Sequence, residues 1–409
     1  MGDKYDPKTR LEDLAIYGAR PAFDEDLHVG RPNIGNRATL LERMNEILDN
    51  RWLTNNGRYV QEFERHIANL VGVRHCVAMC NATSALEMTI SALQLSGEVV
   101  VPSFTFVATA HALQWQGITP AFADIDPTSH NLDPTRVEQM ITARTSAIIG
   151  VHLWGRACNV EALEEIASRR GLRLLFDAAH AFGCSHKGRM IGGFGDAEVF
   201  SFHATKILNS FEGGAVVTNN DVLADKTRLM RNFGFAGYDH VTRLGLNGKM
   251  TEVCAAMGLT SLEAMPEIVA INRRNWEIYH GELTGLPGVS IIEYDSHERN
   301  NYHYIVTEVD SEKAPLTRDQ LLAVLKKENV LARKYFWPGC HRMAPYDSLY
   351  PNASAALSQT EQVASRVMIL PTGQTVTPKI IRTICSLIRC AFDNASKIRK
   401  LLETQPTDV

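Results

Sequence analysis

The chain has 409 residues, of which 45% are hydrophobic and 22% are charged, as in an ordinary folded globular protein. Its formal net charge of −4 argues against a nucleic-acid-binding protein, because such proteins usually carry a basic face. No apolar run reaches the roughly 20 residues that a membrane span needs, and the N-terminal stretch MGDKYDPKTRLEDL has no apolar signal-peptide core. We therefore expect a cytoplasmic protein with no nucleic-acid or membrane partner.

The eight cysteines are scattered, with no CxxC pair and no histidines at zinc-binding spacing. This pattern favours small core residues in a reducing compartment and predicts no metal site.

In chain order, residues 1–50 are polar and predict an arm followed by one helix. From residue 73 to residue 217, short β-rich runs alternate with helical patterns. Such alternation with short connections indicates an α/β fold with a mostly parallel sheet, covered by helices on both faces. The predicted strands are 75–80, 98–102, 120–125, 146–153, 173–177, 197–201 and 214–218, and the predicted helices are 83–95, 105–116, 134–143 and 160–171.

Beyond Gly258 the pattern changes. A long helix is predicted over residues 260–283, a strand over 301–309, a helix over 319–330 and a helical region over 380–402. This arrangement is typical of a smaller α+β unit. We therefore divide the chain into an N-terminal arm and helix (1–50), a large α/β domain (51–265) and a small C-terminal α+β domain (266–409).

One lysine, Lys206, lies among apolar and small residues in the stretch FSFHATKILNSFEGGAVV. A lysine in such a place either extends its ammonium to the surface or is used chemically. In a dry pocket it can act as an amine nucleophile or form a Schiff base. The two glycines that follow Glu212 indicate a place where the backbone approaches another group closely.

Polar and aromatic residues follow the other predicted strands, where ligands of α/β sheets gather. After 75–80 come Thr83 and Ser84, which either bind a phosphate at a helix N-terminus or cap that helix, as Thr83 could. After 98–102 comes Phe106, which either stacks on a planar ring or packs in the core. After 173–177 comes Asp177, which either caps a helix or pairs with a cationic ring nitrogen.

Together with Ser201 and Lys206, these residues make the set that pyridoxal phosphate requires. The lysine forms the Schiff base, and the aspartate keeps the pyridine nitrogen protonated so that the ring can accept electrons. The joint occurrence of these residues in strand order favours the chemical interpretation of Lys206.

The sequence resembles the DegT/StrS-type sugar-nucleotide aminotransferases, a fold-type I family of pyridoxal-phosphate enzymes. The resemblance spans nearly the whole chain and rests on the motifs RWLTNNGRYVQEFE, CNATSALEM, VPSFTFVATAHAL, VHLWGRACN, FDAAHAFGC, FSFHATKILNSFEGGAVVT, NFGF, GLNGKMTEVCAAMGLTSLE and YFWPGCH. It implies a large domain with a mostly parallel sheet and a smaller α+β C-terminal domain.

The resemblance also implies residue roles. Lys206 matches the lysine that binds the cofactor covalently, and Asp177 matches the partner of the pyridine nitrogen. The other matched positions are the stacking Phe106, the phosphate contacts Thr83, Ser84 and Ser201, the phosphate contact Asn247 from a neighbouring subunit, and the sugar-nucleotide contacts Lys249 and His341. A residue shared between subunits implies a homodimer with shared active sites.

Two positions depart from the family pattern. His180 stands where the family usually has glutamine, in contact with the phenolic oxygen of the cofactor. Lys249 replaces a more usual arginine, so a phosphate there would meet a point charge and not a planar fork.

The implied reaction is a transamination in two halves, with glutamate as the amino donor and a nucleotide-linked keto-sugar as the acceptor. Lys206, once released from the cofactor, moves the proton between cofactor and substrate carbon. One alternative is a deoxygenating enzyme of the same fold, which carries histidine in place of this lysine. Another is a regulator that senses amino sugars without catalysis. The intact lysine, aspartate and phosphate-binding residues argue against both.

The motifs VHLWGRACN, FDAAHAFGC and YFWPGCH look most like the branch of the family that aminates carbon 4 of dTDP-4-keto-6-deoxy-D-glucose in secondary metabolism. The expected product is dTDP-4-amino-4,6-dideoxy-D-glucose, and amination of a dTDP-3-keto-6-deoxyhexose is the alternative. Trp154, Phe336 and Trp337 would suit a sugar with a methyl group at carbon 5, although each could instead be a packing residue.

Overall fold

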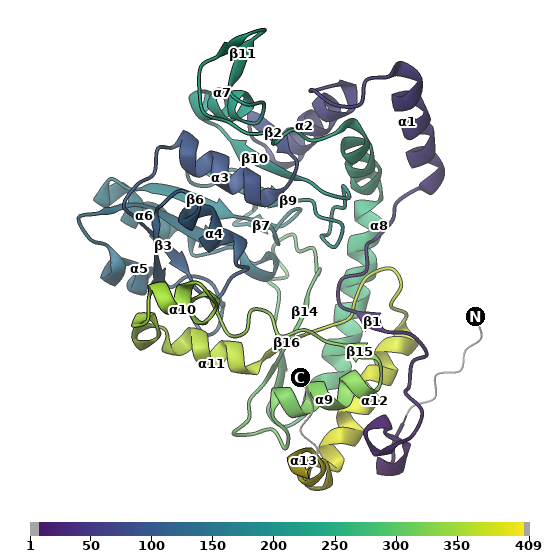
Figure 1. Ribbon diagram of the computed structural model, residues 1–409. Helices are drawn as coiled ribbons and strands as arrows, with labels where there is room; N and C mark the ends of the chain where they lie inside the picture. Colours follow the sequence, from purple (N-terminus) through teal and green to yellow (C-terminus); the bar gives the residue numbers. More distant parts are fainter. Residues whose placement is uncertain (1–7, 405–409) are drawn as a thin grey trace.

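The computed structural model describes residues 8–404. Its central sheet has seven strands in the order β2-β10-β9-β6-β5-β3-β4 (Figure 1). All of them are parallel except β10, which pairs antiparallel with both β2 and β9. The mostly parallel sheet predicted from the sequence is confirmed. Its strands are β2 (His75–Met79), β3 (Glu98–Pro102), β4 (Thr119–Ala123), β5 (Thr145–Val151), β6 (Arg173–Asp177), β9 (Ala197–Ser201) and β10 (Gly214–Thr218).

Helices cover both faces of this sheet, because its strands are apolar on both sides. One face packs against α2 (Arg58–Val71), α5 (Pro134–Met140), α6 (Val160–Arg170) and the first half of α8 (Glu252–Leu283). The other face packs against α3 (Ala82–Ala92), α4 (Ala108–Gln114) and α7 (Asp221–Met230). The predicted helices over 83–95, 105–116, 134–143 and 160–171 are present, with ends shifted by up to three residues.

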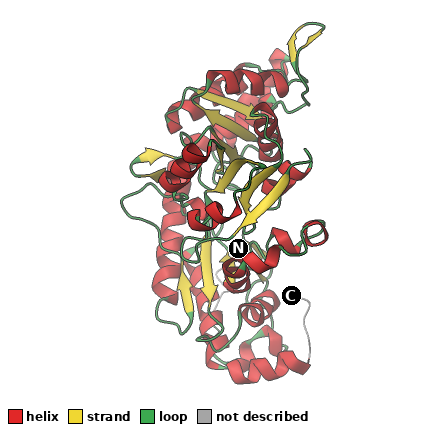
Figure 2. Ribbon diagram, turned by 90° about the vertical axis from the view of Figure 1, so that its left-hand side faces the viewer, coloured by secondary structure: helices red, strands yellow, loops and turns green. Residues whose placement is uncertain are grey.

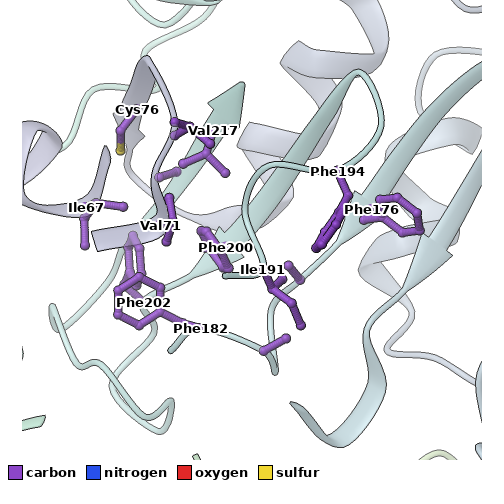
Figure 3. Close-up of a cluster of buried hydrophobic side chains, with 14 of the residues drawn as sticks. Ile67, Val71, Cys76, Phe176, Phe182, Ile191, Phe194, Phe200, Phe202 and Val217 are labelled. Carbon is purple, nitrogen blue, oxygen red and sulfur yellow. The ribbon is translucent and has the colours of Figure 1, made fainter. Parts of the chain in front are cut away.

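The first of these cores contains a cluster of phenylalanines next to the lysine-bearing segment (Figure 3). Phe182 meets Phe200 and Phe202 edge to face, with ring centroids 5.2 and 5.3 Å apart. Side chains alternate along a strand, so Ser201 is turned away from these two neighbours. The packing of Phe200 and Phe202 therefore fixes the end of β9 and the start of the loop that carries Lys206.

The helix α8 runs along the long axis of the molecule from the large sheet to the C-terminal region (Figure 1). Thr251 begins it by accepting a hydrogen bond from the N–H of Cys254. By length and composition alone α8 could cross a membrane, but core helices pass the same test, and its residues enter two cores. It also crosses the predicted domain boundary at 265/266, so the division into 1–50, 51–265 and 266–409 stays a prediction.

The C-terminal region has a second core around a three-stranded antiparallel sheet of order β13-β14-β16. Its elements are β13 (Val289–Ile291), β14 (Ile305–Val309), α9 (Arg318–Lys327), β15 (Val330–Leu331), β16 (Val367–Leu370), α12 (Pro378–Asp393) and α13 (Ala395–Thr404). Between β15 and β16 the chain returns to the large sheet, where Cys340, Tyr346 and Leu357 join the core beneath α3 and α4. This stretch contains η4 (Cys340–Arg342), α10 (Tyr346–Leu349), η5 (Ala353–Ala356) and α11 (Ser358–Arg366).

The N-terminal arm packs on this C-terminal core. Leu14 and Phe23 are buried in it, and β1 (Leu27–His28) pairs in parallel with β15. The arm also contains η1 (Leu11–Asp13) and η2 (Ala15–Tyr17), and it leads to α1 (Arg37–Asn50), the predicted helix. The first seven residues of the predicted segment 1–50 lie outside the described residues.

Two short hairpins complete the fold: β7 (Ser185–His186) with β8 (Arg189–Met190), and β11 (Phe235–Gly237) with β12 (His240–Val241). The second hairpin projects from the top of the molecule (Figures 1 and 2). None of the eight cysteines is in a disulfide, and six of them are buried, as their predicted core role requires.

Candidate active site

A cavity of about 730 Å³ lies at the carboxyl ends of the parallel strands. Such a place is the usual ligand site of an α/β sheet. The cavity brings together six of the residues predicted from the sequence: Thr83, Phe106, Asp177, His180, Ser201 and Lys206. The N-terminal arm closes one side of it with residues 28–32, and residues from the segments after β15 and before β14 close another.

Lys206 lies in the loop after β9, where its N–H donates a hydrogen bond to the carbonyl oxygen of His203. Its side chain is accessible only in part, and Nζ donates to the Tyr304 hydroxyl at 3.2 Å. Burial lowers the pKa of Lys206 to about 8, although the charge of Asp177 opposes this effect. At pH 7 about a tenth of this amine is therefore neutral and able to act as a nucleophile or base, far more than of an ordinary lysine.

Asp177 is the last residue of β6 and is buried. Its carboxylate accepts hydrogen bonds from the Thr109 hydroxyl at 2.8 Å and from the N–H of Ala179 at 3.1 Å. Burial raises the pKa of Asp177, and these two hydrogen bonds oppose that rise. Thr109, on α4, was not predicted as a site residue, because its role depends on a partner 68 residues away.

His180 is buried between aromatic rings, with its ring centroid 4.3 Å from that of Tyr304 and 5.6 Å from that of Trp154. Burial, together with the charge of Lys206, holds the pKa of His180 well below its ordinary value, so the ring is neutral. Its Nδ1 accepts from the N–H of Trp154, which leaves the proton on Nε2. A neutral histidine of this tautomer offers one donor, as the side-chain amide of the more usual glutamine would.

The start of α3 is capped by Asn81, whose side-chain oxygen accepts from the N–H of Ser84. The alternative in which Thr83 caps α3 is therefore wrong, and Thr83 lines the cavity instead. Ser84 does not line the cavity, and its N–H is bonded to the Asn81 side chain. Of the two adjacent glycines, Gly214 must lack a side chain, because a Cβ there would lie 2.5 Å from the Ala82 nitrogen. Glycine thus lets β10 approach the helix end closely, as the sequence indicated.

Phe106 is 61% exposed although it is a large apolar side chain, and it lines the cavity at a tilt to Phe336. Burial in the core, the alternative considered for it, is wrong. An exposed aromatic face in a cavity is suited to stacking on a planar ligand.

Besides Ser84, three predicted site residues lie outside this cavity. Asn247 is exposed, and its main chain forms an isolated antiparallel β-bridge with Asn232. The ammonium of Lys249 donates to the Asn232 side chain at 3.0 Å. His341 is buried, with Nδ1 2.7 Å from the Ser103 hydroxyl and Nε2 3.2 Å from a carboxylate oxygen of Glu361. Within one chain, therefore, none of the three side chains reaches the Lys206 site.

Several cavity residues were not found by sequence reasoning. Four of them come from segments distant from the lysine motif: His303, Tyr304, Arg333 and Tyr335. The fifth, Glu212, lies within that motif, but nothing in the motif marked it as a cavity residue. Of the three residues expected to favour a methyl-bearing sugar, only Phe336 lines the cavity. Trp154 is fully buried behind it, and Trp337 lies outside it. In residues 8–404, no group of three or more histidine, cysteine, aspartate or glutamate side chains could hold a metal ion.

The arrangement fits pyridoxal phosphate. The N–H groups of Ala82 and Thr83, which the Asn81 cap does not use, together with the close backbone of Gly214, provide a place for a phosphate at the start of α3. Asp177 is held as a hydrogen-bonded carboxylate, Phe106 offers a ring face, and Lys206 is the amine with a lowered pKa. The fold and the site therefore define a pyridoxal-phosphate enzyme with a catalytic lysine.

Comparison with known proteins identifies the family. Residues 36–389 match the DegT/DnrJ/EryC1/StrS aminotransferase family, and the chain belongs to it. The fold class, the cofactor and the aminotransferase activity expected from the sequence are thereby confirmed.

The chain is 35% identical over 368 residues to the dTDP-4-amino-4,6-dideoxy-D-glucose transaminase of Escherichia coli, covering 89% of this chain and 98% of that protein. It is 31% identical over 355 residues to the GDP-perosamine synthase of Vibrio cholerae, covering 86% and 95%. Among solved structures it resembles DesI, determined in the presence of its TDP-sugar product, with a TM-score of 0.91 and 50% identity over 97% of this chain and all of that one.

Proposed function

We propose that the enzyme transfers an amino group from glutamate to carbon 4 of dTDP-4-keto-6-deoxy-D-glucose and forms dTDP-4-amino-4,6-dideoxy-D-glucose. The observation that carries this proposal is the end-to-end similarity to a transaminase named for that product, together with the likeness to DesI. The residues that such a reaction needs meet in one cavity of this chain. A role in the secondary metabolism of deoxysugars fits the same chemistry.

The chain's own residues then divide the work. Lys206 would hold the cofactor covalently, and Asp177 would lie against its ring nitrogen. Thr83, Ser201 and the first turn of α3 would hold its phosphate. When bound, pyridoxal phosphate supplies an electron sink for the carbon that gains or loses the amino group. The Lys206 amine, whose pKa is about 8, moves the proton to and from that carbon.

The test uses purified enzyme with glutamate and, separately, the 4-keto and the 3-keto dTDP-6-deoxyhexoses, with products identified by mass spectrometry and NMR. We expect amination of the 4-keto sugar. Amination of the 3-keto sugar alone would overturn the regiochemistry. Lys206→Ala should lose turnover and also the cofactor adduct that borohydride fixes on the protein, and wild-type turnover in this variant would refute the role of Lys206.

We also propose that the enzyme is a homodimer with shared sites. Asn247 lies outside its own cavity and is exposed, so it is available to a second copy. Large apolar side chains near it and on the segment after α1 are exposed too, as in interaction surfaces: Trp52, Leu53, Tyr238, Val241 and Leu244.

Subunit mixing tests the shared site. Lys206→Ala and Asn247→Ala subunits, each inactive alone, should regain activity when combined, because one of the two mixed sites carries both native residues. Verified heterodimers without any recovered turnover would contradict a role for Asn247 across the interface.

A further inference from the structure

The environment of the free Lys206 amine contains an arrangement that the reaction outlined above does not use. Nζ donates to the Tyr304 hydroxyl at 3.2 Å and lies 5.9 Å from the centre of the Tyr304 ring. This is the single hydrogen bond that Nζ makes to another described residue. Lys206 comes from the loop after β9, and Tyr304 is the residue just before β14, 98 residues further along the chain.

The Tyr304 hydroxyl is fixed in space by packing. Its ring is 6% exposed and lies against His180, with centroids 4.3 Å apart, and against Trp154, at 5.5 Å. The main chain at Tyr304 is also held, since its carbonyl oxygen accepts from the Tyr294 hydroxyl. A side chain so enclosed cannot follow a moving lysine, so the lysine must come to it.

The same hydroxyl stays protonated. Burial raises the pKa of Tyr304 well above its ordinary value, and the neighbouring Tyr335 and Tyr294 add to that rise. Tyr304 therefore offers the ammonium a neutral oxygen, which orients Nζ without the strong attraction of a phenolate or carboxylate. Lys206 can then leave this position when it reacts.

The neighbouring His303 fixes the loop on which Lys206 lies. Its Nε2 is 2.8 Å from the carbonyl oxygen of Thr205, which can only accept, so Nε2 carries the proton. Burial lowers the pKa of His303 to about 4, so the ring is neutral. Its Nδ1 is buried and has no hydrogen-bond partner among the described residues, which leaves an unused acceptor beside the lysine loop.

We propose that Tyr304 is a positioning residue that holds the Lys206 amine, while that amine is not attached to the cofactor, at the place from which it moves the proton. His303 supports this role by fixing the carbonyl of the residue before the lysine. The proposal rests on the transamination proposed above. It adds a residue that touches the lysine and is not itself required to bind the cofactor or the sugar.

The other titratable groups around the amine do not replace this contact. Asp177 carries the one full charge that acts on Lys206 strongly enough to affect its pKa. None of the other titratable or charged side chains that line the cavity makes a hydrogen bond to Nζ: His28, Arg31, His180, His203, Glu212, His303, Arg333 and Tyr335. Loss of the Tyr304 hydroxyl therefore leaves the Lys206 ammonium without a hydrogen-bond acceptor among residues 8–404.

The test compares wild type, Tyr304→Phe and the control Tyr279→Phe in the amine form of the holoenzyme, in which Lys206 is free. Tyr279 is fully buried and donates one hydrogen bond to the carbonyl of Pro371, far from the cavity, so its variant loses the same atom elsewhere. The amine form is made with glutamate or, independently of any donor, by loading pyridoxamine phosphate. Lys206 is then titrated by competitive acylation and peptide mass spectrometry.

Removing an acceptor from the charged form lowers the pKa of an amine. In Tyr304→Phe we expect the neutral fraction of Lys206 at pH 7 to rise about threefold, since a modest hydrogen bond is lost. In the aldehyde form of the holoenzyme, we also expect the single-turnover rate with glutamate to fall about tenfold and its α-deuterium isotope effect to grow, because a misplaced base slows proton transfer. The KM for the sugar nucleotide should hardly change, and Tyr279→Phe should match wild type in all four measurements.

An unchanged labelling profile of Lys206 in Tyr304→Phe would overturn the proposal. A rate loss with an unchanged isotope effect and a weakened hold on the cofactor would also overturn it, since Tyr304 would then be a cofactor contact. The labelling experiment needs no sugar. Failure of the wild type to aminate any keto-sugar nucleotide would thus refute the proposed function and leave the position of Lys206 tested separately.

Discussion

Lys206 places a positive charge where water is largely excluded, and this should destabilise the cofactor-free fold. The pKa of Lys206 is lowered from 10.5 to about 8 by burial. For a basic group with a lowered pKa, the penalty is complete below the folded-state value. It fades as pH rises from about 8 to 10.5, where the unfolded chain also loses its proton.

Replacement of the charge should therefore stabilise the cofactor-free protein in a pH-dependent way. We expect Lys206→Met to raise the free energy of unfolding by about 1–2 kcal/mol at pH 7, after allowance for partial exposure and the lost Tyr304 bond. The gain should shrink at pH 9.5. Urea unfolding at both pH values measures it, with Lys397→Met, an exposed lysine on α13, as the control. A gain equal at both pH values would show that the charge is not its cause.

Single residues also show what sequence could and could not settle about the site. The lysine, the aspartate and the residues at the strand ends could be found, because parallel strands bring their carboxyl ends to one edge. The residue that caps α3 could not be found from the sequence, because Asn81, Thr83 and Ser84 are all good capping residues. Only the backbone geometry selects Asn81. The role of Tyr304 could not be predicted either, since its partner Lys206 lies 98 residues away in the sequence.

At the scale of elements, the contact between β10 and α3 depends on Gly214. A Cβ at this position would lie 2.5 Å from the Ala82 nitrogen and 2.5 Å from the Asn81 carbonyl carbon, which are backbone atoms that cannot swing aside. In Gly214→Ala the strand and the helix end must separate, and the phosphate-binding turn moves with them.

We expect Gly214→Ala to lower stability by about 1–3 kcal/mol, the usual range for overpacking. It should also weaken binding of pyridoxal phosphate, which fluorescence titration of the stripped protein can follow. The matched control is Gly237→Ala in β11, where no atom lies within 4 Å of the added Cβ. Equal cofactor affinity in the two variants would contradict a role for this contact in shaping the phosphate-binding turn.

The large-domain elements were predicted well because each strand is short, apolar and bounded by turn residues, and each helix has apolar residues at helical spacing. The helix α2 was not proposed, although its buried positions Tyr59, Val60, Phe63, Ile67 and Val71 carry that spacing. The predicted strand over 301–309 begins only at Ile305. Three of the four residues before it, Asn301, His303 and Tyr304, instead contact His180, Thr205 and Lys206 at the site.

At the scale of the whole molecule, the N-terminal arm joins the small-domain core to the active-site cavity. Its polar sequence predicted an arm but gave no sign of where the arm would pack. Leu14 and Phe23 bury in the C-terminal core, and the residues that follow, 28–32, line the cavity. A surface segment in the sequence is thus a wall of the site in the folded chain.

The anchor of this arm is Glu328, whose side chain is fully buried. Its carboxylate accepts hydrogen bonds from the N–H groups of Ala15 and Ala22, each at 2.7 Å, and pairs with the Lys8 ammonium at 2.6 Å. Three donors from the arm therefore converge on one buried carboxylate of the C-terminal region. Loss of one partner of such a buried pair leaves the others unsatisfied.

In Glu328→Gln an amide NH₂ replaces one accepting oxygen and the charge that Lys8 meets disappears. The variant should lose about 2–4 kcal/mol of the interaction that holds the arm. We expect faster hydrogen exchange over the arm and a raised KM for the sugar nucleotide, while cofactor binding changes little, because Thr83, Ser201 and Lys206 lie on the large domain. Asp24→Asn, an exposed carboxylate of the same arm paired with Arg20, is the control and should match wild type. Faster exchange with an unchanged KM would mean that the arm borders the cavity without contributing to substrate binding.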